Sequence, residues 1–134
     1  MAKRIFPADT SELHNVLAFS DEELEKHNCN MKTQMTIDIM VEEIFVNIAS
    51  YAYEGNKGEM SLEIEFEGND VIYTFIDSGI EFNPLAKEDP DITAKAEDRS
   101  IGGLGIYMVK KSMDEVSYAR EDGKNIFVMK KGIL

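Results

Sequence analysis

The chain has 134 residues, of which 43% are hydrophobic and 30% charged, and its net charge is −12. This size and balance are typical of one globular domain with a real core. The acidic charge argues against proteins that bind nucleic acid, or anionic lipid, through clustered Lys and Arg. No stretch is long and apolar enough to span a membrane. A single cysteine, Cys29, excludes an intramolecular disulfide, and the first residues lack the apolar run of a signal peptide, so we expect a cytoplasmic protein.

The first predicted elements are a strand and a helix. Residues 3–6 fit a short strand, which the following proline ends because it donates no backbone hydrogen bond. Asp9 with Glu12 three residues later is a capping-box pattern, and it predicts a helix that runs to about residue 26. A second match begins at Ser20, so this segment is either one helix or two, and we favour one.

The next predicted element is a long helix over residues 36–53, which is mostly buried. Its apolar side chains recur at steps of three and four residues. They are Ile37, Met40, Val41, Ile44, Phe45, Ile48, Ala49 and Ala52. Glu43 and Asn47 interrupt this pattern and, four residues apart, lie one above the other on a single face. A carboxylate and a carboxamide on a buried helix predict a polar group opposite them.

Two strands follow. Residues 60–67 alternate between apolar and polar, which predicts a strand with one buried face, and residues 71–76 are almost all apolar, which predicts a central strand. The second strand runs directly into Asp77-Ser-Gly79. Residues 80–101 then lose all periodicity, and an irregular segment of this length is usually functional, often a lid.

The remaining segments complete the predicted fold. A glycine cluster, Gly102-Gly-Leu-Gly105, precedes a predicted helix over residues 106–113, a strand around residues 116–118, a hairpin turn at 121–124 and a last strand at 126–130. Because hairpins join most of the strands, the sheet should be mostly antiparallel. Helices gathered on one face of it predict an α/β (α+β) two-layer sandwich.

Three clusters of residues are candidates for ligand binding or catalysis. Glycines at a helix start let backbone N–H groups approach an anion, so residues 102–105 are a candidate phosphate site. The carboxamide oxygen of Asn47 suits Mg²⁺, and Glu43 one turn earlier is placed as a general base. Asp77 is an acceptor suited to an exocyclic amine such as that of adenine, and Gly79 lets a base approach the backbone.

Each cluster by itself is only weak evidence for a functional site. Glu43 and Asn47 also fit the exposed edge of a helix, and Asp77-Ser-Gly79 also fits a plain turn at the end of a strand. A glycine cluster before a helix is common. The order of all three along the chain is therefore the informative feature.

That ordered set resembles the N, G1 and G2 boxes of the GHKL (Bergerat-fold) ATPases. The matching motifs are Glu43-x3-Asn47, Asp77-x-Gly79-x2-Phe82-Asn83-Pro84 and Gly102-Gly103-Leu104-Gly105. Within that superfamily the chain is most similar to the stand-alone anti-sigma-factor serine/threonine kinases, over nearly its whole length. The resemblance implies one histidine kinase-like ATPase domain over residues 1–134, with the mixed, mostly antiparallel sheet of the Bergerat fold.

The resemblance also implies an activity. Such a kinase binds ATP and Mg²⁺, phosphorylates an anti-anti-sigma antagonist protein on serine or threonine, binds a sigma factor, and forms a homodimer. Glu43 would be the catalytic base, Arg99 would reach the γ-phosphate, and Asn47 would bind the magnesium ion. The other nucleotide contacts would be Asp77, Gly79, Phe82, Gly102, Gly103, Leu104 and Gly105. A solvated position for Arg99 remains an equal alternative.

Other functions stay open. One is a nucleotide-gated binding module with little phosphotransfer, which the presence of Glu43 argues against because a pure binder needs no base. Another is an ATP-binding regulator of a client other than a sigma factor, such as a phosphatase or cyclase. Neither His14 nor His27 lies in a phosphoacceptor pattern, so a self-contained histidine kinase is not expected. These kinases commonly have histidine where this chain has Tyr51.

Overall fold

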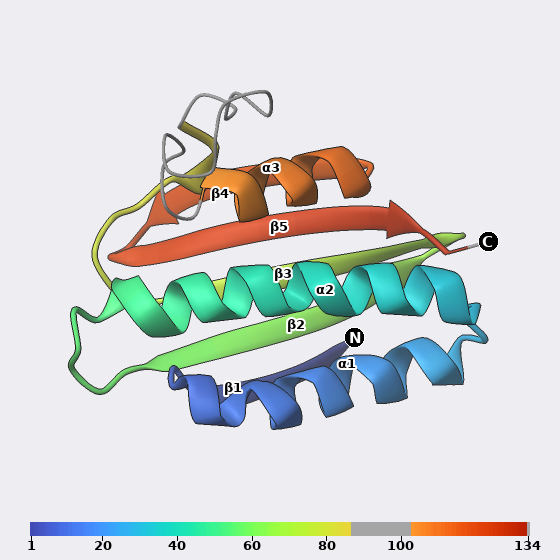
Figure 1. Ribbon diagram of the computed structural model, residues 1–134, viewed down its shortest axis with the longest axis horizontal. Coiled ribbons are helices and arrows are strands. Elements are labelled where there is room, and N and C mark those ends of the chain that lie inside the picture. The colour runs from blue at the N-terminus through green and yellow to red at the C-terminus, as the bar shows by residue number, and fades with distance from the viewer. Residues whose placement is uncertain (87–102, 134) are drawn as a thin grey trace.

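The computed structural model describes residues 1–86 and 103–133. Five strands form one sheet in the order β1-β2-β3-β5-β4, and all pairings among the described strands are antiparallel. The strands are β1 (Ala2–Pro7), β2 (Glu59–Glu67), β3 (Asp70–Asp77), β4 (Glu115–Glu121) and β5 (Lys124–Gly132). The longer helices are α1 (Leu13–Lys26), α2 (Met31–Asn47) and α3 (Gly103–Ser112). Figure 1 shows these helices on one side of the sheet, which confirms the two-layer sandwich.

The N-terminal segment follows the predicted order. Asp9 caps a short 3₁₀ turn at Thr10–Glu12 by accepting a hydrogen bond from the Ser11 N–H (2.9 Å), and α1 continues from this turn without a break. The favoured single helix is confirmed. Ser20 is fully buried within it, and its hydroxyl hydrogen-bonds the hydroxyl of Tyr73 from β3 instead of capping a new helix.

The central helix begins and ends differently from the prediction. It starts at Met31, five residues early, because the side chain of Asn30 accepts the Thr33 N–H at 2.8 Å and so caps the helix there. After Asn47 the backbone widens into a π-helical turn, Ile48–Ala52, a rare geometry that is frequent at functional sites.

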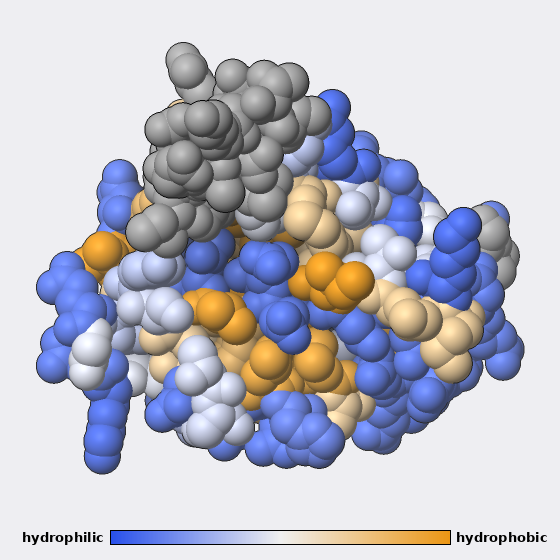
Figure 2. Space-filling model, viewed as in Figure 1, coloured by the Kyte–Doolittle hydropathy of each residue, from blue (hydrophilic) through white to orange (hydrophobic). Residues whose placement is uncertain are grey.

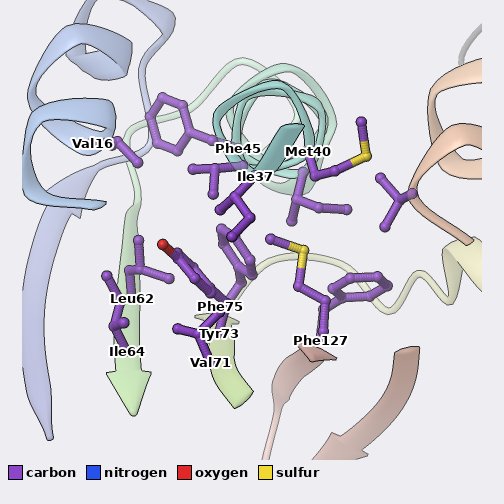
Figure 3. Packing of buried hydrophobic residues seen from close by; sticks show 14 of the residues in the cluster. Val16, Ile37, Met40, Phe45, Leu62, Ile64, Val71, Tyr73, Phe75 and Phe127 are labelled. Carbon is purple, nitrogen blue, oxygen red and sulfur yellow. The ribbon is translucent and has the colours of Figure 1, made fainter. Parts of the chain in front are cut away.

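The core lies between this helix layer and the sheet. Inward-facing residues of β2 and β3 pack against α2, as Figure 3 shows for Leu62, Tyr73 and Phe75. Each large side chain buried in this way stabilises the fold by roughly 1.5–3 kcal/mol. The central position of β3 is confirmed, but Ile72, Thr74 and Ile76 alternate with its buried residues and are only half-buried on the other face of the sheet.

The C-terminal segment also shifts slightly. The turn between β4 and β5 has positive φ at Asp122 and Gly123, as the predicted hairpin requires. β5 starts at Lys124, two residues earlier than predicted, so Asn125 lies inside the sheet. α3 starts at Gly103, three residues earlier than predicted. Within the part of the chain that the structure describes, no helix has the length and hydropathy needed to cross a bilayer.

Candidate functional site

A cavity of about 440 Å³ opens between the C-terminal part of α2, the π-turn and the ends of β3 and β5. Its lining is mainly apolar, with Asp77, Asn47 and Asn125 among the polar groups. The full lining is Ile44, Asn47, Ile48, Tyr51, Ala52, Asp77, Ile80, Phe82, Pro84, Ile106, Tyr118, Asn125 and Phe127. A pocket of this size, with few polar groups among apolar walls, is typical of small-molecule sites.

Asp77 is the buried carboxylate at the end of β3, with 5% of its surface exposed. Its Oδ1 atom accepts hydrogen bonds from the Gly79 N–H (2.9 Å) and from Nδ2 of Asn125 (3.0 Å). A carboxylate can accept hydrogen bonds at both oxygens, so Oδ2 is suited to a donor on a ligand in the cavity that Asp77 lines.

The loop after Asp77 packs directly against the π-turn. The Ile80 N–H donates to the Ala52 carbonyl at 2.8 Å, and a side chain at Gly79 would collide with that same carbonyl group. On its other side, Nη1 of Arg120 in β4 donates to the Gly79 carbonyl at 2.9 Å. Glycine is therefore required at position 79 by the close approach of two backbones.

Asn125 fixes the same loop from β5. Its Nδ2 atom donates to the Ile80 carbonyl at 2.7 Å as well as to Asp77. Its Oδ1 atom accepts from the Phe82 N–H at 3.2 Å and from the Tyr118 hydroxyl. Every hydrogen-bonding direction of the carboxamide is occupied, which holds the floor of the cavity in one conformation.

The sequence analysis missed Asn125, Tyr118 and Arg120. A signal existed for Asn125, since it stands two residues before Phe127 and four before Met129, both buried. Continuing that period-two pattern backwards places a polar residue on the inward face of the strand. No comparable sequence pattern identifies Tyr118 and Arg120 as site residues, because only the pairing of β4 with β5 in the hairpin brings them to the cavity.

Glu43 lies at the other end of the site, against the first turn of α3. It is half-buried on α2, and a Cβ atom at position 105 would collide with its carboxylate. Only glycine at 105 allows the start of α3 to approach Glu43 this closely. The positive end of a helix dipole therefore lies beside the carboxylate.

Asn47 lies one helical turn after Glu43, as the last residue of α2, and it lines the cavity. The structure thus places Asn47, Asp77 and Phe82 around one cavity. It also brings Gly105 against Glu43, one helical turn before Asn47. Gly103 and Leu104 are the first two residues of α3. Arg99, Gly102 and the predicted lid from residue 87 onward lie outside the described residues.

This arrangement has a counterpart among known families. The family model described as the histidine kinase-like ATPase domain matches residues 6–131. The chain belongs to this family. The predicted family resemblance is confirmed, and in this histidine kinase-like ATPase domain the cavity is lined by residues of the first two motifs and by Ile106, which directly follows the third.

Curated relatives match about 70% of this chain. The chain is similar to serine-protein kinase RsbW of Bacillus cereus, with 27% identity over 96 residues that cover 69% of this chain and 60% of the relative. It is also similar to serine/threonine-protein kinase BtrW of Bordetella bronchiseptica, with 25% identity covering 70% of this chain and 67% of the relative. The match therefore spans about 60% of the length of the first of these relatives.

Solved structures confirm the fold. The RsbU and RsbW domains of Rv1364c from Mycobacterium tuberculosis superpose with a TM-score of 0.67 and 15% identity, covering 99% of this chain and 33% of that one. The catalytic domain of histidine kinase ThkA superposes with a TM-score of 0.54 and 15% identity, covering 99% and 97%. At these identities the likeness concerns the sandwich architecture alone.

Proposed function

We propose that this domain is an ATP-dependent serine/threonine protein kinase that acts as an anti-sigma factor in a partner switch and phosphorylates an anti-anti-sigma antagonist protein. The observation that supports this proposal best is that the site combines an apolar part suited to a base with a polar part suited to phosphates. A buried acceptor, Asp77, lies at the apolar end, and Glu43 lies against the start of α3, with Asn47 one helical turn after it on α2. The names of the curated relatives point to the same reaction.

The apolar end fits adenine. Oδ2 of Asp77 accepts hydrogen bonds only, and adenine offers an exocyclic amine where guanine offers a carbonyl oxygen. Guanine would place two acceptors opposite each other in a buried site, which is unfavourable. The apolar cavity walls contributed by Ile44, Ile80 and Phe127 suit the faces of a purine ring. Phe82, at the rim, is proposed as a further contact.

The opposite end fits magnesium-bound phosphates. Asn47 offers an oxygen ligand of the kind that Mg²⁺ prefers, and the N–H groups of the first turn of α3, including Gly103 and Gly105, favour an anion. When bound, MgATP supplies the phosphoryl group. We propose that Gly102 and Leu104 extend this phosphate contact and that Arg99 stabilises the transferred charge.

Glu43 is the proposed general base. It holds its carboxylate beside the start of α3, where the end of a phosphate chain contacting that helix would lie. From there it can accept the proton of a serine or threonine hydroxyl as the hydroxyl attacks phosphorus.

The proposed setting is a cytoplasmic homodimer. β1 is an edge strand, paired only with β2 among the described strands, so its outer edge can pair with the same strand of a second copy around a two-fold axis. Light scattering at micromolar concentration tests this, because a mass of one chain would exclude the dimer.

The decisive experiment is incubation with labelled ATP, Mg²⁺ and a purified anti-anti-sigma antagonist domain. Transfer of label to a serine or threonine of that domain supports the kinase. A stable complex without transfer supports the nucleotide-gated binding module instead. Absence of both transfer and binding would contradict the proposed partner, and a competition assay with purified sigma factors then tests the anti-sigma role separately.

A further inference from the structure

The outward face of α2 exposes an apolar stripe. Met31, Met35 and Ile39 are 67%, 59% and 49% exposed and follow one another at steps of four residues, so they form one row along the helix. Met108 of α3, 39% exposed, adds an apolar side chain from the neighbouring helix. α2 is the middle helix of the layer in Figure 1, and Figure 2 shows hydrophobic residues gathered at the centre of this face.

Packing within this chain does not explain why the stripe is apolar. The inward side of α2 already supplies the core through residues such as Ile37, Val41 and Ile44. A helix with a buried stripe on one side normally has polar residues on the other. Contiguous exposed apolar residues on a folded protein commonly mark an interaction site.

The stripe leads to the proposed catalytic base. Ile39 precedes Glu43 by four residues, so the two side chains lie on neighbouring positions of one face. At 1.5 Å per residue, the row from Met31 to Glu43 is about 18 Å long. A protein that presents a hydroxyl to Glu43 therefore has this row directly beside its acceptor residue.

Acidic groups border the stripe on the side of α1. Glu42 lies next to it on α2, and Asp21 and Glu25 of α1 lie beside Asp38. Asp38 itself stays protonated near neutral pH, because burial and then these two acidic groups raise the pKa of its carboxyl group to about 8. Lys32 is the exposed cation on this part of α2. This border favours a partner with basic residues around an apolar patch and disfavours a second copy of this chain, which has a net charge of −12.

We propose that Met31, Met35, Ile39 and Met108 form the docking surface for the protein substrate. The substrate would present an apolar patch, bordered by Lys or Arg, beside its acceptor serine or threonine. This inference rests on the proposed function, because it identifies the surface that brings the acceptor hydroxyl to Glu43. Apolar burial supplies affinity there, and the acidic border supplies orientation.

The test is the double variant Met35→Gln/Ile39→Gln, with Glu65→Gln as the control. Glu65 is exposed on β2 and alternates with the inward-facing Ile64, so it lies on the opposite face of the sheet. The measurements are KM and kcat for phosphotransfer to a purified anti-anti-sigma antagonist domain, the Kd for that domain, and the Kd for ATP. The double variant should raise KM and Kd for the domain at least tenfold, with kcat and the Kd for ATP unchanged, and Glu65→Gln should change none of them.

The outcomes separate the two proposals. If the wild-type chain transfers phosphate and the double variant does so with unchanged KM and Kd, the docking surface is wrong while the kinase stands. If the wild-type chain neither transfers phosphate nor binds the domain, both proposals fail. Equal weakening by Glu65→Gln would also overturn the docking surface, because the effect would then not be local to α2.

Discussion

The carboxamide of Asn125 donates to Oδ1 of Asp77 over 3.0 Å, which joins β5 to the end of β3 inside the cavity. The bond uses the oxygen of Asp77 that also accepts from the Gly79 N–H, and Oδ2 is the oxygen that we propose contacts the adenine amine. The same carboxamide holds the backbone at Ile80 and Phe82. Asn125 is therefore a positioning residue for the proposed adenine contact.

Asn125→Ala should weaken both ATP binding and the fold. It leaves the Ile80 carbonyl and the Phe82 N–H without their partner, at a cost of about 1–3 kcal/mol in the free energy of unfolding. With the loop free to move, the Kd for ATP should rise about tenfold and discrimination against GTP should fall. Titration calorimetry with both nucleotides measures this. Asn69→Ala, in the exposed turn between β2 and β3, is the control.

Glu43→Gln should keep nucleotide binding and lose phosphotransfer. The carboxamide has nearly the same shape but cannot accept the substrate proton, so the rate should fall by at least ~10²-fold. Single-turnover transfer measures the rate, and Glu65→Gln, at an exposed position of β2, should retain it. If Glu43→Gln transferred phosphate at the wild-type rate, Glu43 could not be the general base.

Asn47→Ala should weaken only the magnesium-dependent part of nucleotide binding. The variant removes one oxygen ligand, so the Kd for ATP should rise in the presence of Mg²⁺ and stay the same in the presence of EDTA. Titration of the nucleotide under both conditions measures the difference. An equal Kd for wild type and variant with Mg²⁺ present would exclude Asn47 as a ligand.

Gly105→Ala should displace the carboxylate of Glu43. The added methyl group would collide with that carboxylate, so either α3 or Glu43 must move, and phosphotransfer should fall at least tenfold. Gly132→Ala is the matched control, because a Cβ atom there meets Asp114 and Asp70 only at ordinary contact distance (3.5 Å). If both variants keep full activity, Glu43 does not need its observed position.

Stability should fall between pH 4 and pH 8 because of Asp38. Burial, followed by the adjacent Asp21 carboxyl and then the charge of Glu25, raises the pKa of Asp38 to about 8. In this range the folded chain keeps a proton that the unfolded chain has released, so raising the pH favours unfolding.

Asp38→Asn should therefore be more stable than wild type at pH 7.5. The gain should be about 1 kcal/mol, well below the full shift because solvent screens this partly exposed group, and it should vanish near pH 4. Thermal melts across this range measure it, with Glu65→Gln on β2 as an exposed control. A lower Tm for Asp38→Asn at pH 7.5 would contradict the expected effect.

The elements of this fold follow from local sequence. Period-two alternation identified β2, the three- and four-residue steps identified α2, and Asp122-Gly123 identified the last hairpin, because these patterns depend on neighbours along the chain. The boundaries were less accurate. The start of α2 depends on one side-chain cap at Asn30, and the π-turn after Asn47 has no local signature in the pattern.

The residues of the candidate site also fall into two groups, those that the sequence identified and those that only the structure revealed. The sequence by itself determined the family, because three motifs in order resemble those of known ATPases. Glu43 and Asn47 were recognisable because they are polar on a mostly apolar helix. Only the tertiary structure decided that Asn125, from another strand 48 positions away, fixes Asp77, and that Gly105 is needed beside Glu43. Such contacts depend on sheet order and helix packing, which bring together residues with no spacing in common.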